Sequence, residues 1–258
     1  MSTDEIIHMN DSTHLASTPQ ILVVMPVYNE EASISKVVCE WFNEITKWTD
    51  NFIFLVIDDG STDVTPSILD RLRLQVGPRL EILHQENCGH GQSCLCGYRI
   101  ACERDIPYVF QVDSDGQCDP QYFFHFWRKR DHFDVVYGHR TRRDDGWRRV
   151  AASMILRLTL YLTCGVNCID ANVPYRLMRT SVLINTVDLI PKDFFLANVA
   201  MAVLLKINNF CESTVPIVFK ERYGGELTVK LRNFGEKAIQ LIVPVSYTHL
   251  TLPTKRIV

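Results

Sequence analysis

The stretch ILVVMP, residues 21–26, is an uninterrupted apolar run and decides the fold. Such a run is typical of a strand buried on both faces of a sheet. Apolar runs recur at residues 52–57, 80–83, 108–112 and 134–138. Because the segments between these strands have helical character, the sequence predicts an α/β fold with a mostly parallel, Rossmann-like central sheet flanked by helices.

The clearest of these helices follows the first strand. Apolar residues from Ile34 to Trp48 recur three or four positions apart, the spacing of one amphipathic face. Further helices are predicted around Ile68 to Leu72, from Gly91 to Glu103 and from Tyr122 to Arg130. The last of these is preceded by Asp119-Pro120, an N-cap followed by a proline at the first helical position.

Beyond residue 138 the alternation changes. A polar loop with five arginines comes first, and apolar helices are predicted at residues 150–164 and 194–205, with a late strand at 215–219. No linker separates this part from the first, so we expect one domain of two halves. The helix at 150–164 could line an isoprenoid groove, lie on a membrane surface or simply be buried.

The bulk composition narrows the function classes. The chain has 258 residues, 47% of them hydrophobic, and a net charge of −3. That length suits one large α/β domain, and the charge gives no field that would attract a nucleic acid. Nine cysteines are too few for a disulfide scaffold at this length, which favours reduced thiols in a cytoplasmic protein.

The ends of the chain are expected to differ from its middle. Residues 1–19 are polar and acidic and are predicted to be a flexible tail, while the domain is expected to span residues 20–232, followed by a helix at 233–244. VSYTHLTLPT, within residues 245–258, is what one frame of a common sequencing adapter encodes, so this segment is interpreted as an artefact.

Polar motifs follow four of the predicted strands. They are PVYNE at 26–30, DDGSTD at 58–63, NCGHGQ at 87–92 and DSDGQ at 113–117. Ligands of open α/β sheets bind beyond the carboxyl ends of parallel strands, so these four motifs should meet at one edge. Each has an ordinary alternative as a βα turn or a helix cap, and the hypothesis of a binding site rests on their convergence.

DSDGQ indicates a metal site. Residues two apart in an extended chain face the same side, so Asp113 and Asp115 can point at one cation and Gln117 can add a neutral oxygen. Oxygen ligands suit Mg²⁺ or Mn²⁺. Asp59 could accept hydrogen bonds from a ribose or a base, and Tyr28 could stack on a base.

VVMPVYNE, VIDDGSTDVT, NCGHGQS and QVDSDGQ together resemble the successive motifs of glycosyltransferase family 2, which has the GT-A fold. The resemblance covers roughly residues 20–232 and points toward dolichyl- or polyprenyl-phosphate sugar synthases. It implies metal ligation by Asp113, Asp115 and Gln117. It implies nucleotide-sugar binding by Pro26, Tyr28, Glu30, Ile57, Asp59, Gly89, Asp113, Ser114 and Arg222, with Ser114 standing where the family usually has Ala.

The second half carries further motifs of the same family. VVYGHR at 135–140 resembles a segment whose arginine contacts phosphate, which implies that role for Arg140. One of Arg148 and Arg149 should supply a second contact with the acceptor phosphate. DANVPYRLM at 170–178 resembles an acceptor-side segment, although the lipid-phosphate enzymes usually have SGFR where this chain has VPYR.

The resemblance implies an inverting, metal-dependent hexosyltransferase that uses a UDP- or GDP-sugar, with Asp115, Arg140 and Asp170 in catalytic roles. The acceptor is expected to be a polyprenyl or dolichyl phosphate, and the enzyme to work in the cytoplasm or at the cytoplasmic face of a membrane through peripheral association. A saccharide or protein hydroxyl is the alternative acceptor, for which Asp170 is the candidate base; a structural role for Asp170, as a cap or in a pair with Arg176, is equally open. A sugar-1-phosphate nucleotidyltransferase and a non-catalytic nucleotide-sugar binder are alternatives of another class.

Overall fold

The computed structural model describes residues 18–141, 165, 173–192, 194 and 196–220. The strands are β1 (Ile21–Val27), β2 (Phe52–Asp58), β3 (Leu80–His84), β4 (Tyr108–Gln111), β5 (Val135–Arg140), β6 (Arg176–Arg179) and β7 (Glu212–Ile217). The helices are α1 (Ile34–Thr46), α2 (Thr65–Val76), α3 (His90–Glu103), α4 (Phe123–Trp127), α6 (Thr180–Leu183) and α7 (Ala197–Ile207). Short 3₁₀ turns lie at Pro120–Tyr122 and Val187–Leu189.

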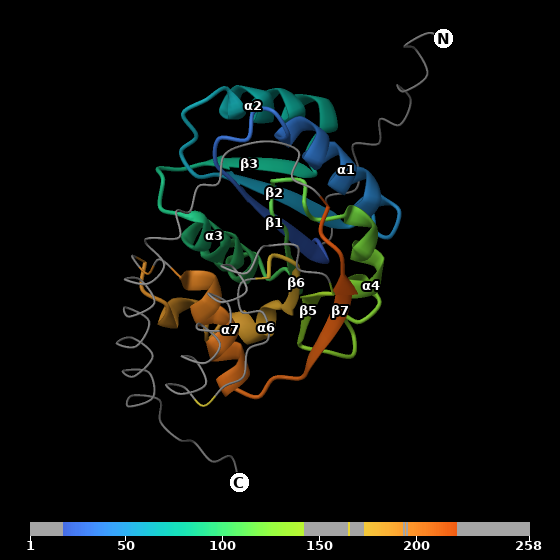
Figure 1. Ribbon diagram of the computed structural model, residues 1–258, viewed down its shortest axis with the longest axis vertical. Coiled ribbons are helices and arrows are strands. Elements are labelled where there is room, and N and C mark those ends of the chain that lie inside the picture. The colour runs from blue at the N-terminus through green and yellow to red at the C-terminus, as the bar shows by residue number, and fades with distance from the viewer. Residues whose placement is uncertain (1–17, 142–164, 166–172, 193, 195, 221–258) are drawn as a thin grey trace.

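The strands form one sheet in the order β3-β2-β1-β4-β6-β5-β7 (Figure 1). β1 pairs in parallel with β2 and β4, β2 with β3, and β5 with β7. β6 is antiparallel to both of its neighbours, β4 and β5. The prediction of an α/β fold with a mostly parallel sheet is therefore confirmed.

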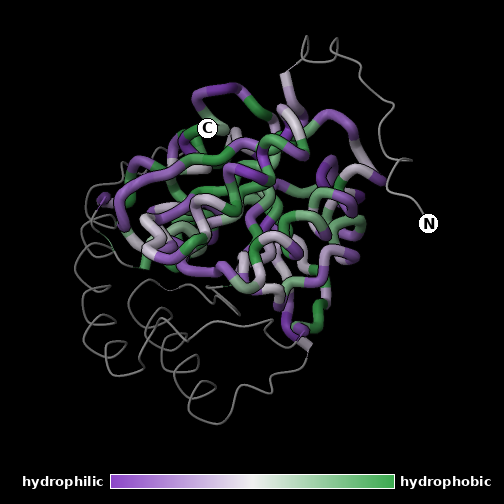
Figure 2. Tube along the Cα trace, turned by 90° about the horizontal axis from the view of Figure 1, so that it is seen from above, coloured by the Kyte–Doolittle hydropathy of each residue, from purple (hydrophilic) through white to green (hydrophobic). Residues whose placement is uncertain are grey.

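Both faces of the sheet are covered, which explains the continuous apolar runs. Ile21, Val23 and Met25 of β1 belong to a core shared with α1, α2 and α4, whereas Leu22 and Val24 belong to a second core shared with α3, α6 and α7. Figure 1 shows these helices on the two sides of the sheet, and Figure 2 shows hydrophobic stretches alternating with hydrophilic ones along the trace. A strand with helices on both faces has no polar side to present to water.

The predicted amphipathic helix is α1, and it ends two residues early. Its buried positions include Val37, Val38, Trp41 and Ile45, the stripe that the spacing predicts. Trp48 lies beyond the helix end, is 41% exposed, and stacks on Phe124 of α4 with ring centroids 4.0 Å apart.

Three predicted elements differ in extent. Asp119 caps as predicted, since its side chain accepts a hydrogen bond from the Gln121 backbone N–H, but a 3₁₀ turn and the short α4 replace one helix to Arg130. β7 begins at Glu212, earlier than the predicted residue 215, and ends at Ile217. α7 begins at Ala197, three residues after the predicted start.

β6 was not predicted as a strand. It has four residues with arginines at both ends, so it lacks the apolar run that marks the other strands. Arg176 is fully buried in the middle of the sheet, where its Nε and Nη1 donate to the backbone oxygens of Val173 and Asn198, at 3.1 and 2.9 Å. Backbone partners stabilise this charged group without exposing it to water.

The predicted helices at 150–164 and 233–244, almost all of the N-terminal tail and residues 245–258 lie outside the described residues. In the part of the chain that the structure describes, the helices are too short or too polar to cross a membrane. Seven cysteines fall in this part, and all are free thiols.

Candidate functional site

The carboxyl ends of the four parallel strands β1 to β4 meet at one edge of the sheet. The register pairs Val27 with Asp58 and Asp58 with His84, so β1, β2 and β3 end side by side. β4 pairs with β1 on its other side, with Gln111 opposite Val24. The loops after these strands contain the motifs that the sequence predicts to converge, and the topology brings them together.

Hydrogen bonds tie the loop after β1 to the loop after β2. Asn29, whose φ of 53° lies in the left-handed region, donates its N–H to Ser61 Oγ at 2.9 Å. Its side-chain oxygen accepts from the Thr62 N–H at 2.7 Å, and the Glu30 N–H donates to Thr65 Oγ1 at 3.0 Å. These contacts fix the two loops relative to each other.

The predicted nucleotide-contact residues of β1 and β2 differ in exposure. Tyr28 is half-buried at the edge, where a ring can be reached. Glu30 is 6% exposed and accepts a hydrogen bond from Ser33 Oγ at 2.9 Å, while Pro26 is buried within β1. The side chain of Ile57 is fully buried in the core under α3, so in this structure it presents no surface to a ligand.

Asp58 is buried and pairs with the exposed His84. Its Oδ1 accepts from the Ser61 N–H at 3.0 Å, and its Oδ2 lies 2.8 Å from His84 Nδ1. Partial burial alone would lower the pKa of His84, but the hydrogen bonds and negative charges of Asp58 and Asp70 raise it above its ordinary value. Asp58 therefore acts within the protein, on its own loop and on β3.

Asp59 organises the loop before α3. Its Oδ1 accepts from the Cys88 backbone N–H and from the Gln85 amide, both at 2.9 Å, and its Oδ2 accepts from the Gly89 N–H at 2.9 Å. Burial alone would raise the pKa of Asp59, but the hydrogen bonds from Cys88, Gln85 and Ser93 outweigh it and hold the pKa below its usual value. The Gly89 N–H, predicted to approach the nucleotide sugar, donates to Asp59 here.

The DSDGQ segment alternates in exposure. Asp113, Asp115 and Gln117 are partly exposed, whereas Ser114 and Gly116 are buried. Gly116 has a φ of 76°, which turns the chain after the two aspartates, and the Gln117 N–H donates to Asp115 Oδ1 at 3.0 Å. The two predicted metal ligands and the predicted amide ligand are thus all accessible from solvent.

His90 is a site residue that the sequence analysis missed. Its Nε2 lies 2.9 Å from Asp113 Oδ1, and its Nδ1 lies 3.5 Å from the side-chain nitrogen of Asn198 in α7. Desolvation would lower the pKa of His90, but the charge and hydrogen bond of Asp113 raise it. The signal in the sequence was a histidine in the glycine loop that opens a helix opposite the acidic loop.

The donors at this edge fit a divalent cation of the hard type. Asp113 and Asp115 offer carboxylate oxygens and Gln117 an amide oxygen, the ligands that Mg²⁺ and Mn²⁺ take. Among the described residues no three His, Cys, Asp or Glu side chains gather into a metal cluster. An ion held by two carboxylates would have positions left for the oxygens of a substrate.

The end of the sheet that carries β5 and β7 supplies positive charge. Arg140 is the last residue of β5, which runs parallel to β4, and its guanidinium carbon lies 4.3 Å from the Phe219 ring centroid. Lys220 donates its backbone N–H to the backbone oxygen of Gln117 at 2.9 Å, and its Nζ lies 3.1 Å from Asp119 Oδ2. Asp170, Arg149 and Arg222 lie outside the described residues.

The sheet, covered on both faces and with acidic loops at its carboxyl edge, has the GT-A fold of its structural neighbours. The family model described as glycosyl transferase family 2 matches residues 22–187, and the chain belongs to this family. The resemblance that the motifs carry is therefore confirmed.

Two curated relatives are named after reactions on a polyprenyl lipid. The chain is 27% identical over 235 residues to a polyprenol monophosphomannose synthase of Mycolicibacterium smegmatis, covering 88% of this chain and 87% of the relative. It is also 27% identical over 234 residues to an undecaprenyl-phosphate 4-deoxy-4-formamido-L-arabinose transferase of Edwardsiella ictaluri, covering 89% and 69%.

The fold is shared with a solved structure of glucosyl-3-phosphoglycerate synthase from Mycobacterium tuberculosis. That crystal contains Mn²⁺, uridine diphosphate and phosphoglyceric acid, and it matches with a TM-score of 0.62 at 16% identity, over 92% of this chain and 80% of that one. At this identity the match speaks for the fold alone.

Proposed function

We propose that this chain is an inverting, metal-dependent hexosyltransferase that moves a sugar from a UDP- or GDP-sugar to a polyprenyl or dolichyl phosphate. The observation that carries the proposal is the partly exposed pair Asp113 and Asp115, at the edge where four parallel strands end. The names of the two curated relatives support a lipid-phosphate acceptor.

The donor would bind along the acidic edge. Tyr28 would stack on the base, and the loops after β1, β2 and β3 would contact the nucleoside, with Asp59 keeping the 85–89 segment in place. A divalent cation held by Asp113, Asp115 and Gln117 would neutralise the diphosphate and stabilise the charge that builds on it as the sugar leaves.

The acceptor would bind toward β5. Arg140 can donate two parallel hydrogen bonds to a phosphate, which a planar guanidinium suits. A phosphate acceptor is already an anion, so it needs little help from a general base. Such an acceptor would bring the enzyme to the cytoplasmic face of a membrane, where peripheral association is enough.

A thermal-shift experiment tests the donor side. Purified protein is heated with UDP- and GDP-sugars, with Mn²⁺, with Mg²⁺ or with chelator alone. We expect one nucleotide to raise the melting temperature only when metal is present, because a ligand that binds the native state alone stabilises it. No shift with any nucleotide would contradict the proposal.

A transfer assay tests the acceptor side. Radiolabelled donor is incubated with detergent-dispersed polyprenyl phosphate, with the corresponding polyprenol, and with a panel of oligosaccharides. We expect label in the lipid phosphate alone, because the polyprenol shares the chain and lacks the anion. Label in an oligosaccharide would favour a hydroxyl acceptor instead, and the orientation of the product at the anomeric carbon would test inversion.

A further inference from the structure

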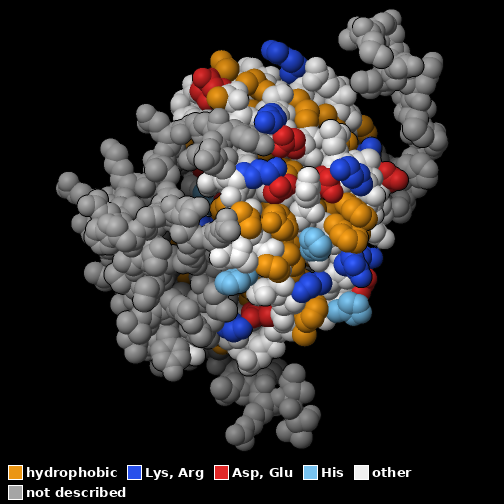
Figure 3. All heavy atoms as spheres, turned by 45° about the vertical axis from the view of Figure 1, so that its right-hand side comes forward, with side chains coloured by type: hydrophobic (Ala, Val, Ile, Leu, Met, Phe, Trp, Pro, Cys, Tyr) orange, Lys and Arg blue, Asp and Glu red, His pale blue; other side chains and the backbone are white. Residues whose placement is uncertain are grey.

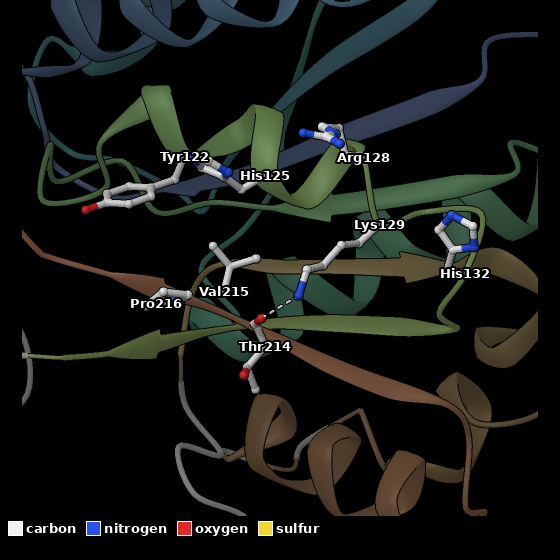
Figure 4. A pocket seen from close by; sticks show the side chains of 8 residues that line it. All are labelled: Tyr122, His125, Arg128, Lys129, His132, Thr214, Val215 and Pro216. Carbon is white, nitrogen blue, oxygen red and sulfur yellow. Dashed lines mark hydrogen bonds between the residues drawn. The ribbon is translucent and has the colours of Figure 1, made fainter.

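A cavity of about 560 Å³ lies outside the carboxyl edge, between α4 and the edge strand β7 (Figure 4). Basic side chains line it from the α4 side, and Thr214 and Pro216 line it from β7. Figure 3 shows basic and histidine side chains among hydrophobic ones on the face that carries these elements. The cavity takes no part in the function proposed above.

The basic residues lie along α4 and the turns that follow it. They are His125, Arg128, Lys129 and His132, at positions i, i+3, i+4 and i+7. Phe123, Phe126 and Trp127 of α4 are buried in the core. Arg128 and Lys129, neighbours in the chain, thus bring two permanent positive charges to the cavity.

Carboxylates do not compensate the positive charge at the cavity within the described part of the chain. There, none of the four basic groups forms an ion pair with Asp or Glu, and the nearby acids are engaged elsewhere. Asp131 pairs with Arg130 at 3.3 Å, and Glu212 pairs with Lys206. The positive charge at the cavity is therefore available to a ligand.

Lys129 is held in place. Its Nζ donates to Ser213 Oγ at 2.8 Å and to the Thr214 backbone oxygen at 2.9 Å, so it reaches across to β7 as Figure 4 shows. Both partners are neutral, so they orient the ammonium group without cancelling its charge. A charge that is already ordered costs less entropy when a ligand binds.

The edge of β7 is closed to an added peptide strand. The oxygens of Cys211 and Ile217 accept from the β5 side, so Thr214, Pro216 and Val218 direct their backbone groups toward the cavity. Pro216 has no N–H, Lys129 occupies the Thr214 oxygen, and the Val218 N–H donates to Tyr122 Oη at 3.2 Å. These contacts disfavour an added strand, so a ligand with negative charge of its own suits this cavity better.

We propose that this cavity binds a phosphomonoester. Its charge of about −1.5 to −2 near pH 7 matches the permanent charges of Arg128 and Lys129, and the imidazole N–H groups of His125 and His132 can add hydrogen bonds. The volume has room for more than the phosphate group, which fits either a soluble phosphorylated metabolite or a lipid whose head group is a phosphomonoester.

The test compares two sources of the same group. Glycerol 3-phosphate is titrated calorimetrically, and vesicles of phosphatidylcholine with phosphatidic acid are sedimented with the full chain, both without nucleotide sugar. The double variant Arg128→Gln with Lys129→Gln removes both charges while the new glutamine at 129 can still donate to β7. Arg71→Gln, an exposed arginine of α2, is the matched control.

We expect at least about a tenfold loss of affinity in the double variant, since each charge-assisted hydrogen bond is worth about tenfold or more. The Arg71 variant should bind like the wild type, and the melting temperature should show all proteins folded. Binding of glycerol 3-phosphate identifies a soluble ligand, and binding to the vesicles alone identifies a lipid. No binding of either probe, an equal loss in the Arg71 variant, or equal binding to phosphatidylglycerol vesicles would overturn the proposal.

Discussion

The two halves of the sheet end in opposite charges. In the parallel half, β3, β2, β1 and β4, the loops at the carboxyl edge carry Asp58, Asp59, Asp113 and Asp115. In the mixed half, β6, β5 and β7, the same edge carries Arg140 and Lys220. β6 runs the other way, so its carboxyl end lies at the opposite edge.

Under the proposed function, this difference would let one edge hold two unlike partners. A divalent ion and a diphosphate suit the acidic half, and an anionic acceptor suits the basic half, so the bond to be broken would lie where the halves meet, between β4 and β5. A hydrogen bond links the two halves across this boundary, because the backbone oxygen of Gln117 accepts the Lys220 backbone N–H.

The largest expected effect comes from removing one acid. Asp115→Asn should lower the rate of sugar transfer by about a hundredfold to a thousandfold, the usual range when one charge-stabilising group is lost. The amide can still accept from the Gln117 N–H, so the fold should be kept. Transfer is measured at saturating Mn²⁺, with circular dichroism as the check on folding.

Asp105→Asn is the matched control for this variant. Asp105 is exposed in the turn before β4, at the opposite edge, and its φ of 53° suits asparagine. Its rate should equal that of the wild type. An unchanged rate in the Asp115 variant would refute a metal role for that carboxylate and, with it, the division of the edge into two charges.

An intermediate effect is expected from replacing one glycine by alanine on each side of the boundary between the two halves of the sheet. A Cβ on Gly138 of β5 would lie 2.6 Å from Ile217 Cδ1 and 2.9 Å from Tyr175 Cβ. On Gly97 of α3 it would lie 2.4 Å from Val24 Cγ1. Gly138→Ala should therefore cost about 1–3 kcal/mol of unfolding free energy, and Gly97→Ala about 1 kcal/mol less, because alanine favours a helix.

Urea unfolding followed by tryptophan fluorescence and by circular dichroism measures both variants. If the halves form one cooperative domain, each variant should shift a single transition, and the two probes should coincide. Two separate transitions, with each glycine affecting a different one, would mean that the halves unfold independently.

The parallel half was predictable from the sequence and the mixed half less so. β1 and β2 are neighbouring strands with helices on both faces of the sheet. Burial on both faces requires apolar runs such as the one at residues 21–26. β6 is paired with β4 and β5 by long-range contacts, and its buried Arg176 depends on backbone oxygens that only the folded chain supplies. A sequence pattern within a window of six residues cannot reveal partners that lie far away in the chain.

The site was predictable in its residue types and not in its internal contacts. The motif spacing indicated that Asp59 and Asp113 reach one edge, because strand direction alone decides that. The sequence could not show that the Asp59 carboxylate accepts hydrogen bonds from the backbone N–H groups of Cys88 and Gly89. Nor could it show that the His90 side chain contacts Asp113. Those contacts depend on loop geometry, which a glycine pattern allows in several forms.

The smallest expected effect concerns a charge pair inside the acidic half. The pKa of His84 is raised above 6.5 by its carboxylate neighbours Asp58 and Asp70, so the pair stabilises the native state fully below pH 6.5. This contribution is lost as the pH rises through the higher pKa of the folded state. Because His84 is 40% exposed, it should amount to less than about 1 kcal/mol.

His84→Gln should remove this pH dependence while keeping a donor for Asp58. Urea midpoints of the variant and the wild type are compared on both sides of pH 6.5, and the difference should be larger at the lower pH. His139→Gln, at an exposed position of β5 in the mixed half, controls for the loss of a histidine outside this pair. Equal pH profiles for all three proteins would mean that the Ser61 N–H, and not the charge of His84, stabilises the Asp58 carboxylate. The acidic half would then fold without a positively charged His84.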